Sequence, residues 1–182
     1  MLWDRITGDE VHRDWVPIEA ISPNLIRAVI SSEDNFYCLH HGIDWSEVRV
    51  VLETGSDRGA STIPMQTVRN LMLWQGRSYI RKALEVPIAF YADIVLGKRR
   101  IMEIYLNVAE WGPGVFGIEA ASQYHFGVSA SELTILQATL LAVTLPSPHN
   151  RDPGDPTASL NRLAGTIGAR VAAGVDISCL GI

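Results

Sequence analysis

Several features that mark common protein classes are scarce or missing in this chain of 182 residues. The two cysteines, Cys38 and Cys179, are too few for a disulfide scaffold and lack the spacing of a zinc site, so they indicate little about the compartment. The longest run without charge, 133–150, contains polar residues and two prolines, and it predicts a core helix with an exit turn rather than a membrane span. Residues 1–14 contain no apolar segment of the kind found in signal peptides. We therefore expect a chain that is soluble or peripheral to a membrane.

Charged residues are also few, and they are unevenly distributed along the chain. Charged residues make up 19% of the chain and hydrophobic residues 47%, which is typical of one globular domain with a substantial core. The net charge of −5 argues against a general nucleic-acid binder. Seven basic residues nevertheless fall between Arg69 and Arg100, against the two acids Glu85 and Asp93. This segment predicts either a local anionic ligand, most simply a phosphate, or a solvated helix face.

Apolar residues recur at spacings of three and four in successive segments, and this period predicts an essentially all-α chain. The predicted helices cover 18–30, 45–52, 61–76, 78–95, 98–107, 118–126, 133–145 and 155–173. Their expected starts are Ser22-Pro23, a capping box at 44–47, Ser61, Ser78, a capping box at 129–132, and Asp155-Pro156. Pro87 is expected to kink its helix, and Gly76 and Gly127 are expected to end theirs.

Two carboxylates stand in apolar surroundings and are the first candidates for a functional site. The buried stripe that runs from Ile18 to Ile30 would next place residue 33 in the core, and the sequence has Glu33 there. A bare buried carboxylate is costly, so Glu33 must be paired, hydrogen-bonded or functional, with a helix cap or a salt bridge as the alternative explanation. Glu85 is the one charged residue within 83–92, and Arg81, one turn earlier, could pair with it.

Five separated stretches are similar, in the same order, to the motifs of one enzyme family. They are Glu33-Asp34 with His40 and Gly42, then 59–66 with Asn70, then 81–85, 98–107 and 138–146. Together they resemble the peptidoglycan glycosyltransferases, or transglycosylases, which polymerise lipid II. The resemblance covers roughly residues 15–153, and no transpeptidase sequence follows. The chain is therefore most similar to the monofunctional biosynthetic members of that family.

This resemblance implies a lysozyme-like, two-lobed helical fold with a central cleft, formed by a single domain over 1–182. It implies lipid II and the growing glycan strand as substrates and a divalent cation, Mg²⁺ or Mn²⁺, as an aid. The expected location is the periplasmic face of the bacterial inner membrane, at the membrane surface, with cell-wall synthesis or division proteins as partners. Glu33 would be the general base, because a sugar hydroxyl is a poor nucleophile without one. Glu85 would lie by the pyrophosphate and hold a cation or orient basic residues.

The expected substrate contacts are mostly cationic and amide side chains. Arg69, Arg77 and Lys82 are the candidates for neutralising the leaving pyrophosphate. The full expected set is Asp34, Tyr37, His40, Ser61, Thr62, Gln66, Arg69, Asn70, Arg77, Arg81, Lys82, Lys98, Glu103 and Asn107. Within this set, His40 is expected to stabilise a turn and Glu103 to brace the cleft.

The sequence also departs from the family pattern. Tyr37 stands where the family usually has phenylalanine, and Met65 replaces the first of two glutamines, so that either a polar contact is lost or Met65 packs. Arg69 replaces a lysine and keeps its charge with a different geometry. The usual N-terminal transmembrane anchor has no expected counterpart here. Two other functions fit part of the sequence: a lytic enzyme of lysozyme-like fold, which has no need of the basic segment, and a degenerate protein that binds lipid II or acts as a scaffold.

Overall fold

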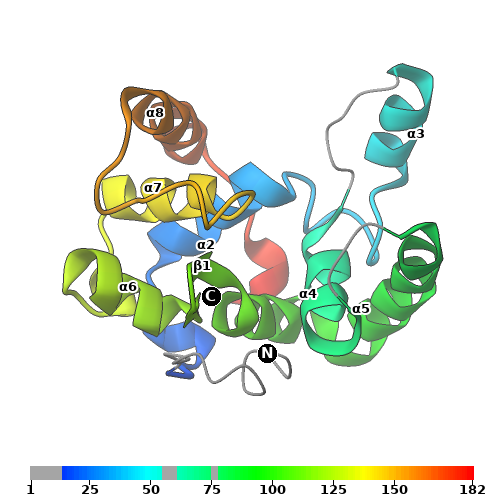
Figure 1. Ribbon diagram of the computed structural model, residues 1–182. Helices are drawn as coiled ribbons and strands as arrows, with labels where there is room; N and C mark the ends of the chain where they lie inside the picture. The colour runs from blue at the N-terminus through cyan, green and yellow to red at the C-terminus, as the bar shows by residue number, and fades with distance from the viewer. Residues whose placement is uncertain (1–13, 55–60, 75–77) are drawn as a thin grey trace.

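The computed structural model describes residues 14–54, 61–74 and 78–182, and most of them are helical, which confirms the expected all-α class (Figure 1). The α-helices are α2 (Pro23–Glu33), α3 (Trp45–Thr54), α4 (Ile63–Met72), α5 (Tyr79–Val108), α6 (Ile118–Phe126), α7 (Ile135–Thr144) and α8 (Ala158–Ala173). Three short 3-10 turns are η1 (Ile18–Ala20), η2 (Ala130–Glu132) and η3 (Ser178–Leu180). None of the described helices is both long enough and apolar enough to cross a bilayer.

The helices form two lobes, which we name by their elements. The large lobe contains α2, α6, α7, α8 and the second part of α5, and it holds the main core, with Leu25, Met102 and Leu141 fully buried. The small lobe contains α3, α4 and the first part of α5, and its own core is a cluster of Ile43, Met65, Val68 and Ala89. Figure 1 shows α6, α7 and α8 on one side of the molecule and α3, α4 and the start of α5 on the other.

The first predicted helix is interrupted, which corrects the expected limits of 18–30. The turn η1 ends at Ala20, and α2 begins at Pro23 after the extended residue Ile21. The position of Ser22 as N-cap is confirmed, but its hydroxyl donates to the carbonyl of Leu133 instead of capping α2. The contact ties the start of α2 to the segment before α7.

Three other helix starts lie later than the sequence suggests. The N-cap of α4 is Thr62, whose hydroxyl accepts from the amide of Met65, so the expectation for Ser61 was wrong. The capping box at 129–132 caps only η2, while α7 has its own box at 134–137. Thr157 caps α8, two positions after Asp155. In each case a hydroxyl nearer the helix satisfies the first free amides.

The predicted helices 78–95 and 98–107 are parts of the single element α5. Its non-helical dihedral angles fall at Gly97, where φ is +74°, and not at Pro87, where the sequence predicts a kink. A positive φ is readily adopted by glycine, so Gly97 lets the chain change direction between the two lobes. α5 is therefore the element that links the small lobe to the large one.

The segment after α5 forms a small antiparallel hairpin. Strand β1 (Glu110–Gly112) pairs with β2 (Val115–Phe116), with Glu110 opposite Phe116. Trp111, in β1, is fully buried in the main core. The hairpin therefore holds Glu110 at a fixed place directly after the end of α5.

Cys38 and Cys179 form a disulfide that the sequence analysis did not predict. The bond joins the loop after α2 to η3, across a sequence separation of 141. Arg99 supports the same junction, because it donates to the carbonyl of Leu180 at 2.9 Å. The C-terminal segment is thus fastened to the loop that carries the first motif.

Candidate active site

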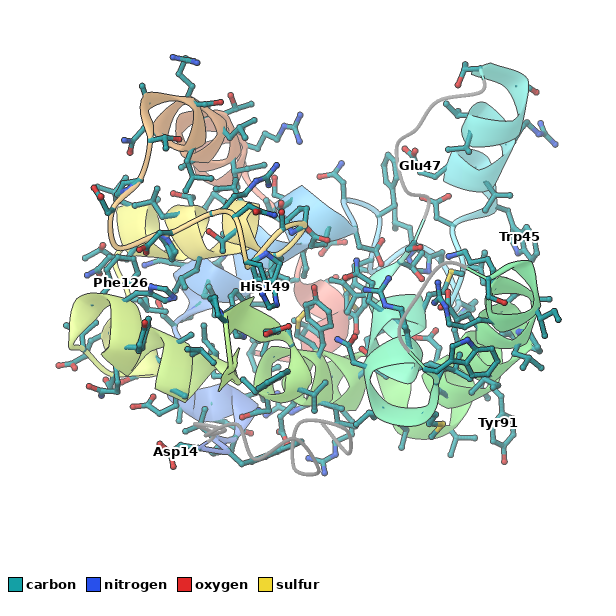
Figure 2. The ribbon with its side chains drawn as sticks, viewed as in Figure 1. Asp14, Trp45, Glu47, Tyr91, Phe126 and His149 are labelled. Atoms are coloured by element: carbon teal, nitrogen blue, oxygen red, sulfur yellow. A yellow bond between two sulfur atoms is a disulfide. The ribbon has the colours of Figure 1, made fainter. Side chains whose placement is uncertain are left out.

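Two neighbouring cavities that share part of their walls lie between the lobes. The catalytic cavity, of about 650 Å³, is lined by residues that include Glu33, Asp34, Glu47, Ser61 and Arg170. The hairpin cavity, of about 410 Å³, is lined by residues that include Asn70, Glu110, Phe116 and His149. Both are lined by Gln66, Arg69, Leu145 and Pro146. In Figure 2, Glu47 and His149 mark the two cavities.

Glu33 is the last residue of α2 and is held by hydrogen bonds on both carboxylate oxygens. Gln66 of α4 donates its amide to Oε2 at 3.0 Å, and Ser32 donates its hydroxyl to Oε1 at 3.2 Å. Gln66 is itself fixed, because it accepts from the hydroxyl of Tyr105 at 3.2 Å and donates to the carbonyl of Ser61 at 3.2 Å. The carboxylate therefore has one orientation at the wall of the cavity.

The surroundings of Glu33 make it a better base than a free glutamate. Burial raises its pKa, because the charged form loses solvation, while the hydrogen bonds and the nearby Arg69 and Arg151 oppose the shift. The position at a helix C-terminus also disfavours a negative charge. A carboxylate with a raised pKa holds a proton more readily, which suits a general base near neutral pH.

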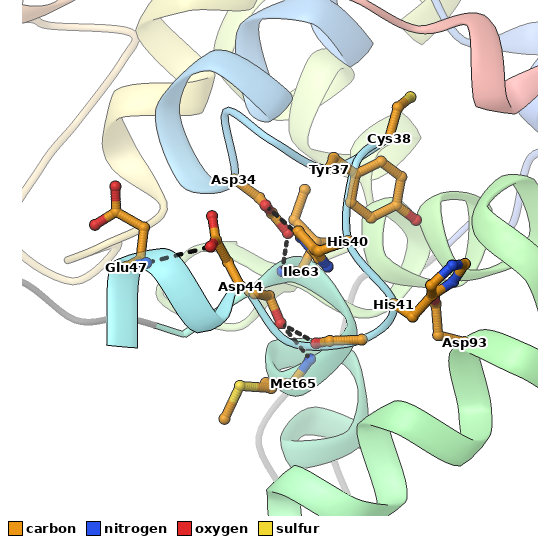
Figure 3. Close-up of polar contacts among 12 residues, drawn as sticks. Asp34, Tyr37, Cys38, His40, His41, Asp44, Glu47, Ile63, Met65 and Asp93 are labelled. Carbon is orange, nitrogen blue, oxygen red and sulfur yellow. Dashed lines mark hydrogen bonds and ion pairs between the residues drawn. The ribbon is translucent and has the colours of Figure 1, made fainter. Parts of the chain in front are cut away.

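The residues that follow Glu33 form a turn that is bonded to the start of α4. Asp34 accepts from His40 at 2.8 Å through Oδ1 and from the amide of Ile63 at 3.0 Å through Oδ2 (Figure 3). Thr62 donates its hydroxyl to the carbonyl of Gly42 at 2.5 Å. His40 thus stabilises the turn, as predicted.

Gly42 lets this turn approach α5 closely. Its φ is +72°, and a Cβ at this position would lie 2.7 Å from Cα of Phe90. Any larger residue would push the turn and α5 apart. The first motif therefore contacts both α4 and α5.

Glu85 is a paired, buried carboxylate. Its side chain is 1% exposed, and it forms ion pairs with Arg81 and with Lys82, the latter at 3.1 Å. Lys82 also donates to the hydroxyl of Ser61 at 2.6 Å, at the wall of the catalytic cavity. The expected pairing of Glu85 with Arg81 is confirmed, and Glu85 orients both cations.

Lys82 is an unusual cation. Its contact with Glu85 favours the charged amine, but burial and the neighbouring charges of Arg69 and Arg81 lower its pKa to about 8. The amine is thus still mostly charged at neutral pH, and a phosphate beside it would favour that charge further.

Among the described residues, the side chains of Arg69 and Asn70 have no hydrogen-bond or ion-pair partner. Arg69 lines both cavities, so its guanidinium is available at the point where they meet. Arg77, the third cation expected to neutralise the pyrophosphate, lies outside the described residues. A free guanidinium is well suited to bind phosphate oxygens in pairs.

The described residues do not fit a divalent cation at Glu85. The carboxylate already contacts Arg81 and Lys82, and their two positive charges would repel a metal ion. No group of three or more possible ligands occurs in the described part of the chain. The tentative metal role of Glu85 therefore has no support in its surroundings.

Seven predicted substrate-binding residues of the described chain line neither cavity: His40, Arg81 and Lys82, whose contacts are given above, and Tyr37, Lys98, Glu103 and Asn107, which are engaged elsewhere within the protein. Tyr37 is fully buried and donates to the carbonyl of Lys98 at 2.7 Å. Lys98 pairs with Asp93 at 3.0 Å and lies over the ring of Tyr37. These contacts hold the break in α5 against the loop that follows α2.

Asn107 and Glu103 are the other two residues that are engaged elsewhere. Asn107 binds both the amide and the carbonyl of Val16, each at 2.9 Å, and Glu103 accepts from the amide of Ile18 at 3.3 Å and pairs with Arg100. They bind the N-terminal segment to α5, and the bracing of the cleft expected of Glu103 stays a prediction. Substrate contact by these four residues stays a prediction.

Met65, the departure in the second motif, packs in the small-lobe core and is 2% exposed. Sequence reasoning missed Glu110, His149 and Arg170 at the cavity walls, and Arg151, whose charge acts on Glu33. Arg151 donates to the carbonyl of Val143, and Arg170 to the carbonyl of Ser31 at 3.4 Å. No pattern in the sequence placed them there, because they come from α8, the hairpin and the loop after α7.

Comparisons with known proteins agree with this geometry. A family model described as Transglycosylase matches residues 2–171. The chain is 52% identical over 185 residues to a protein of Agrobacterium fabrum named biosynthetic peptidoglycan transglycosylase, covering 99% of this chain and 82% of the relative. Proteins of the same name from Rhizobium meliloti and Nitrobacter hamburgensis are 53% and 50% identical, with 78% and 81% of their lengths covered.

Proposed function

Because the chain belongs to the transglycosylase family, as a peptidoglycan glycosyltransferase that makes glycan strands, we propose that its substrate is lipid II and that Glu33 is its general base. The 4-hydroxyl of an acceptor N-acetylglucosamine attacks C1 of an N-acetylmuramic acid that carries a lipid pyrophosphate. Glu33 takes the hydroxyl proton as the new C1–O bond forms. The C1–O bond to phosphate breaks, its electron pair leaves with the pyrophosphate, and the α-linked donor becomes a β-1,4 product.

The observation that carries this proposal is the setting of Glu33. Its two oxygens are oriented by Gln66 and Ser32 at the wall of a cavity, and burial raises its pKa. A base must be held within hydrogen-bond reach of the hydroxyl that it deprotonates, and its pKa should lie toward the working pH. Both conditions favour Glu33 over Glu85, which is already paired with two cations.

The cations beside the cavity suit the leaving group. A pyrophosphate is a weak base and needs charge neutralisation more than a proton. Arg69, free at the junction of the cavities, and Lys82, oriented by Glu85 and Ser61, would contact its oxygens. Glu85 thereby acts as a positioning residue.

A divalent cation enters the proposal only as a counter-ion of the substrate's own phosphates. Since no described cluster could hold Mg²⁺ or Mn²⁺, removal of the ion with a chelator is expected to leave the unfolding temperature unchanged. A chelator that lowered the unfolding temperature would instead indicate a metal site in the protein.

The reaction belongs to the cell envelope, and the proposed location within it is the periplasmic face of the inner membrane. The Cys38–Cys179 disulfide supports an oxidising compartment. Ile80, Tyr91 and Ile94 of α5 are each more than 60% exposed, which supports contact with a membrane surface. Cell-wall synthesis or division proteins remain proposed partners.

The decisive experiment is polymerisation of labelled lipid II by the purified chain in detergent, beside Glu33→Gln. The proposal expects long glycan strands from the wild type and none from the variant. Equal activity in both would remove Glu33 from the mechanism. Bound but unreacted lipid II with both proteins would favour a scaffold function, and cleavage of finished peptidoglycan would favour a lytic enzyme.

A further inference from the structure

The segment that carries the proposed base is fastened to the C-terminal part of the chain on both sides of Glu33. Before Glu33, the carbonyl of Ser31 accepts from Arg170 of α8 at 3.4 Å. After it, Cys38 is bonded to Cys179 of η3. The C-terminal part of the chain therefore brackets the end of α2, and the disulfide is the covalent one of the two contacts.

The disulfide lies within the turn 34–42, which follows Glu33 (Figure 3). Tyr37, directly before Cys38, is fully buried and donates to a carbonyl of α5 at 2.7 Å. His40, two positions after the cysteine, is bonded to the start of the turn at 2.8 Å. Because anchored side chains flank the cysteine closely, the disulfide restrains the whole turn and not its own residue alone.

The other end of the bond belongs to the short segment after α8. Ile177 and Leu180 of this segment are buried in the main core, and Arg99 of α5 donates to the carbonyl of Leu180 at 2.9 Å. These contacts give the segment a place of its own on the large lobe. It is thus the fixed point to which the disulfide ties the turn.

Both cysteines are partly exposed, at the edge of the main core. Their neighbours in the chain, Leu39 and Ser178, are exposed. A thiolate from the solvent can therefore approach the bond. Exposed disulfides exchange with thiols more readily than buried ones, because the exchange needs access to a sulfur atom.

We propose that the Cys38–Cys179 disulfide is a redox-sensitive latch on the turn 34–42, and that a dithiol which reduces it lowers the turnover of the enzyme. A thiolate of the dithiol attacks one protein sulfur, and the electron pair of the S–S bond leaves on the other sulfur, which takes a proton. The second thiol of the dithiol then displaces the first protein sulfur. Two electrons and two protons thus pass to the protein, and the dithiol becomes a disulfide.

Reduction loosens the turn and leaves the protein folded. The hydrogen bonds of Tyr37 and His40, and those of Glu33 to Gln66 and Ser32, do not involve the cysteines. The restraint on the residues directly after Glu33 is lost. Small displacements of a catalytic group are costly, so kcat is expected to fall about five- to tenfold. The cations on α4 and α5 keep their places, so KM should change by less than about twofold.

The first test needs no substrate. The wild type is reduced with dithiothreitol under native conditions, its thiols are counted, and amide hydrogen exchange is followed by NMR. The amides of Tyr37 and Leu39 are bonded within the turn, to the carbonyls of Asp34 and Phe36. Reduction should speed their exchange about tenfold relative to the amides of α6. A bond that dithiothreitol reduces only in denaturant, or an exchange that reduction leaves unchanged, would overturn the inference.

The second test measures the turnover of lipid II by the oxidised wild type, by the reduced wild type, and by the chain carrying both Cys38→Ser and Cys179→Ser. The reduced protein and the double variant should share a kcat that is about five- to tenfold lower than that of the oxidised protein. Reoxidation should restore the wild type and not the variant. A kcat that reduction leaves the same would contradict the latch.

The matched control is Ile118→Ala, at the start of α6. Ile118 is fully buried in the main core, and α6 lies on the side of the molecule away from the small lobe (Figure 1). Its truncation should lower the stability of the fold without touching the turn, so its kcat should match that of the oxidised wild type. An equal loss of kcat in Ile118→Ala would assign the effect of reduction to stability alone and would overturn the latch.

This inference rests on the proposed function, because the second test follows the reaction at Glu33. The two can fail separately. An oxidised wild type that does not polymerise lipid II would refute the proposed function, and the exchange measured in the first test would still decide whether the bond restrains the turn.

Discussion

The two lobes differ in how firmly they hold their functional groups. Glu33 ends α2, which packs on α7 and α8 within the extensive core of the large lobe. The cations lie on α4 and the first part of α5, above a small cluster of Ile43, Met65, Val68 and Ala89. A proton transfer requires atoms placed to within a hydrogen bond, whereas charge neutralisation acts over longer distances. The lobe with the larger core thus carries the group that needs the stricter geometry.

The largest expected effect concerns Glu33, the group in the large lobe that needs the stricter geometry. Glu33→Gln should lower the polymerisation rate by about 10²–10⁴-fold, because it removes the base. The free energy of unfolding near neutral pH should stay the same or rise, since the raised pKa means that the charged carboxylate is less stable in the folded protein than in the unfolded one. The rate of lipid II consumption and a urea titration measure the two quantities.

The matched control for this change is Glu47→Gln, which removes a carboxylate from the wall of the same cavity. Its rate should stay close to that of the wild type, because the hydrogen bonds that orient Glu33 come from Gln66 and Ser32 and not from Glu47. An equal loss in both variants would mean that the cavity requires negative charge in general rather than a base at Glu33.

The disulfide gives the next largest effect, and it acts where the turn after α2 meets the C-terminal segment. Replacing both Cys38 and Cys179 by serine should lower the free energy of unfolding by about 2–5 kcal/mol, because the bond closes a long loop in the unfolded chain. Denaturant unfolding with and without reductant is the measurement. The wild type in reductant should match the double variant, and a wild type that is insensitive to reductant would show that the bond does not form in solution.

The two cores can be compared directly by replacing one methionine in each with alanine. Met102 is fully buried in the main core and Met65 is 2% exposed in the small-lobe cluster. Met102→Ala should cost about 2–5 kcal/mol of unfolding free energy, and Met65→Ala less than half as much, because the small cluster can collapse into the space that is left. Urea midpoints of the two variants measure this, and equal losses would contradict the difference in packing between the lobes.

The smallest expected effect is the pH dependence of kcat/KM that arises from Lys82 in the small lobe. The pKa of Lys82 is lowered to about 8, so the free enzyme loses this charge as the pH rises through that value. The kcat/KM for lipid II should therefore fall severalfold between about pH 7 and pH 9, and Lys82→Arg should flatten the decline because arginine stays charged. A wild-type profile that is flat across this range would mean that the charge of Lys82 is not used.

Much of this arrangement follows from local sequence. The period of the apolar residues predicts the helices, and the interruption of a buried stripe by a carboxylate points to Glu33. The pairing of Glu85 with Arg81 follows from their spacing along one helix. These features depend on neighbours within a turn or two of the chain, where residue spacing determines geometry.

Features that depend on tertiary contacts could not be predicted in the same way. Cys38 and Cys179 are separated by 141 positions, and spacing along the sequence contains no information about their meeting in space. Lys98 looks like one more cation of the basic segment, yet the break at Gly97 brings it onto Asp93 and Tyr37. Glu110 and His149 come from a hairpin and a loop whose contact only the folded chain creates.

The disulfide has one more consequence, which concerns the covalent topology of the chain. It closes a ring from Cys38 to Cys179 that contains Gln66, Arg69 and Glu110, while Glu33 lies just outside it. A single cut by a protease anywhere in that ring leaves one connected molecule, in which both cavity walls stay attached to the segment that carries the base. Such a nicked protein would migrate as one species without reductant and as two with it.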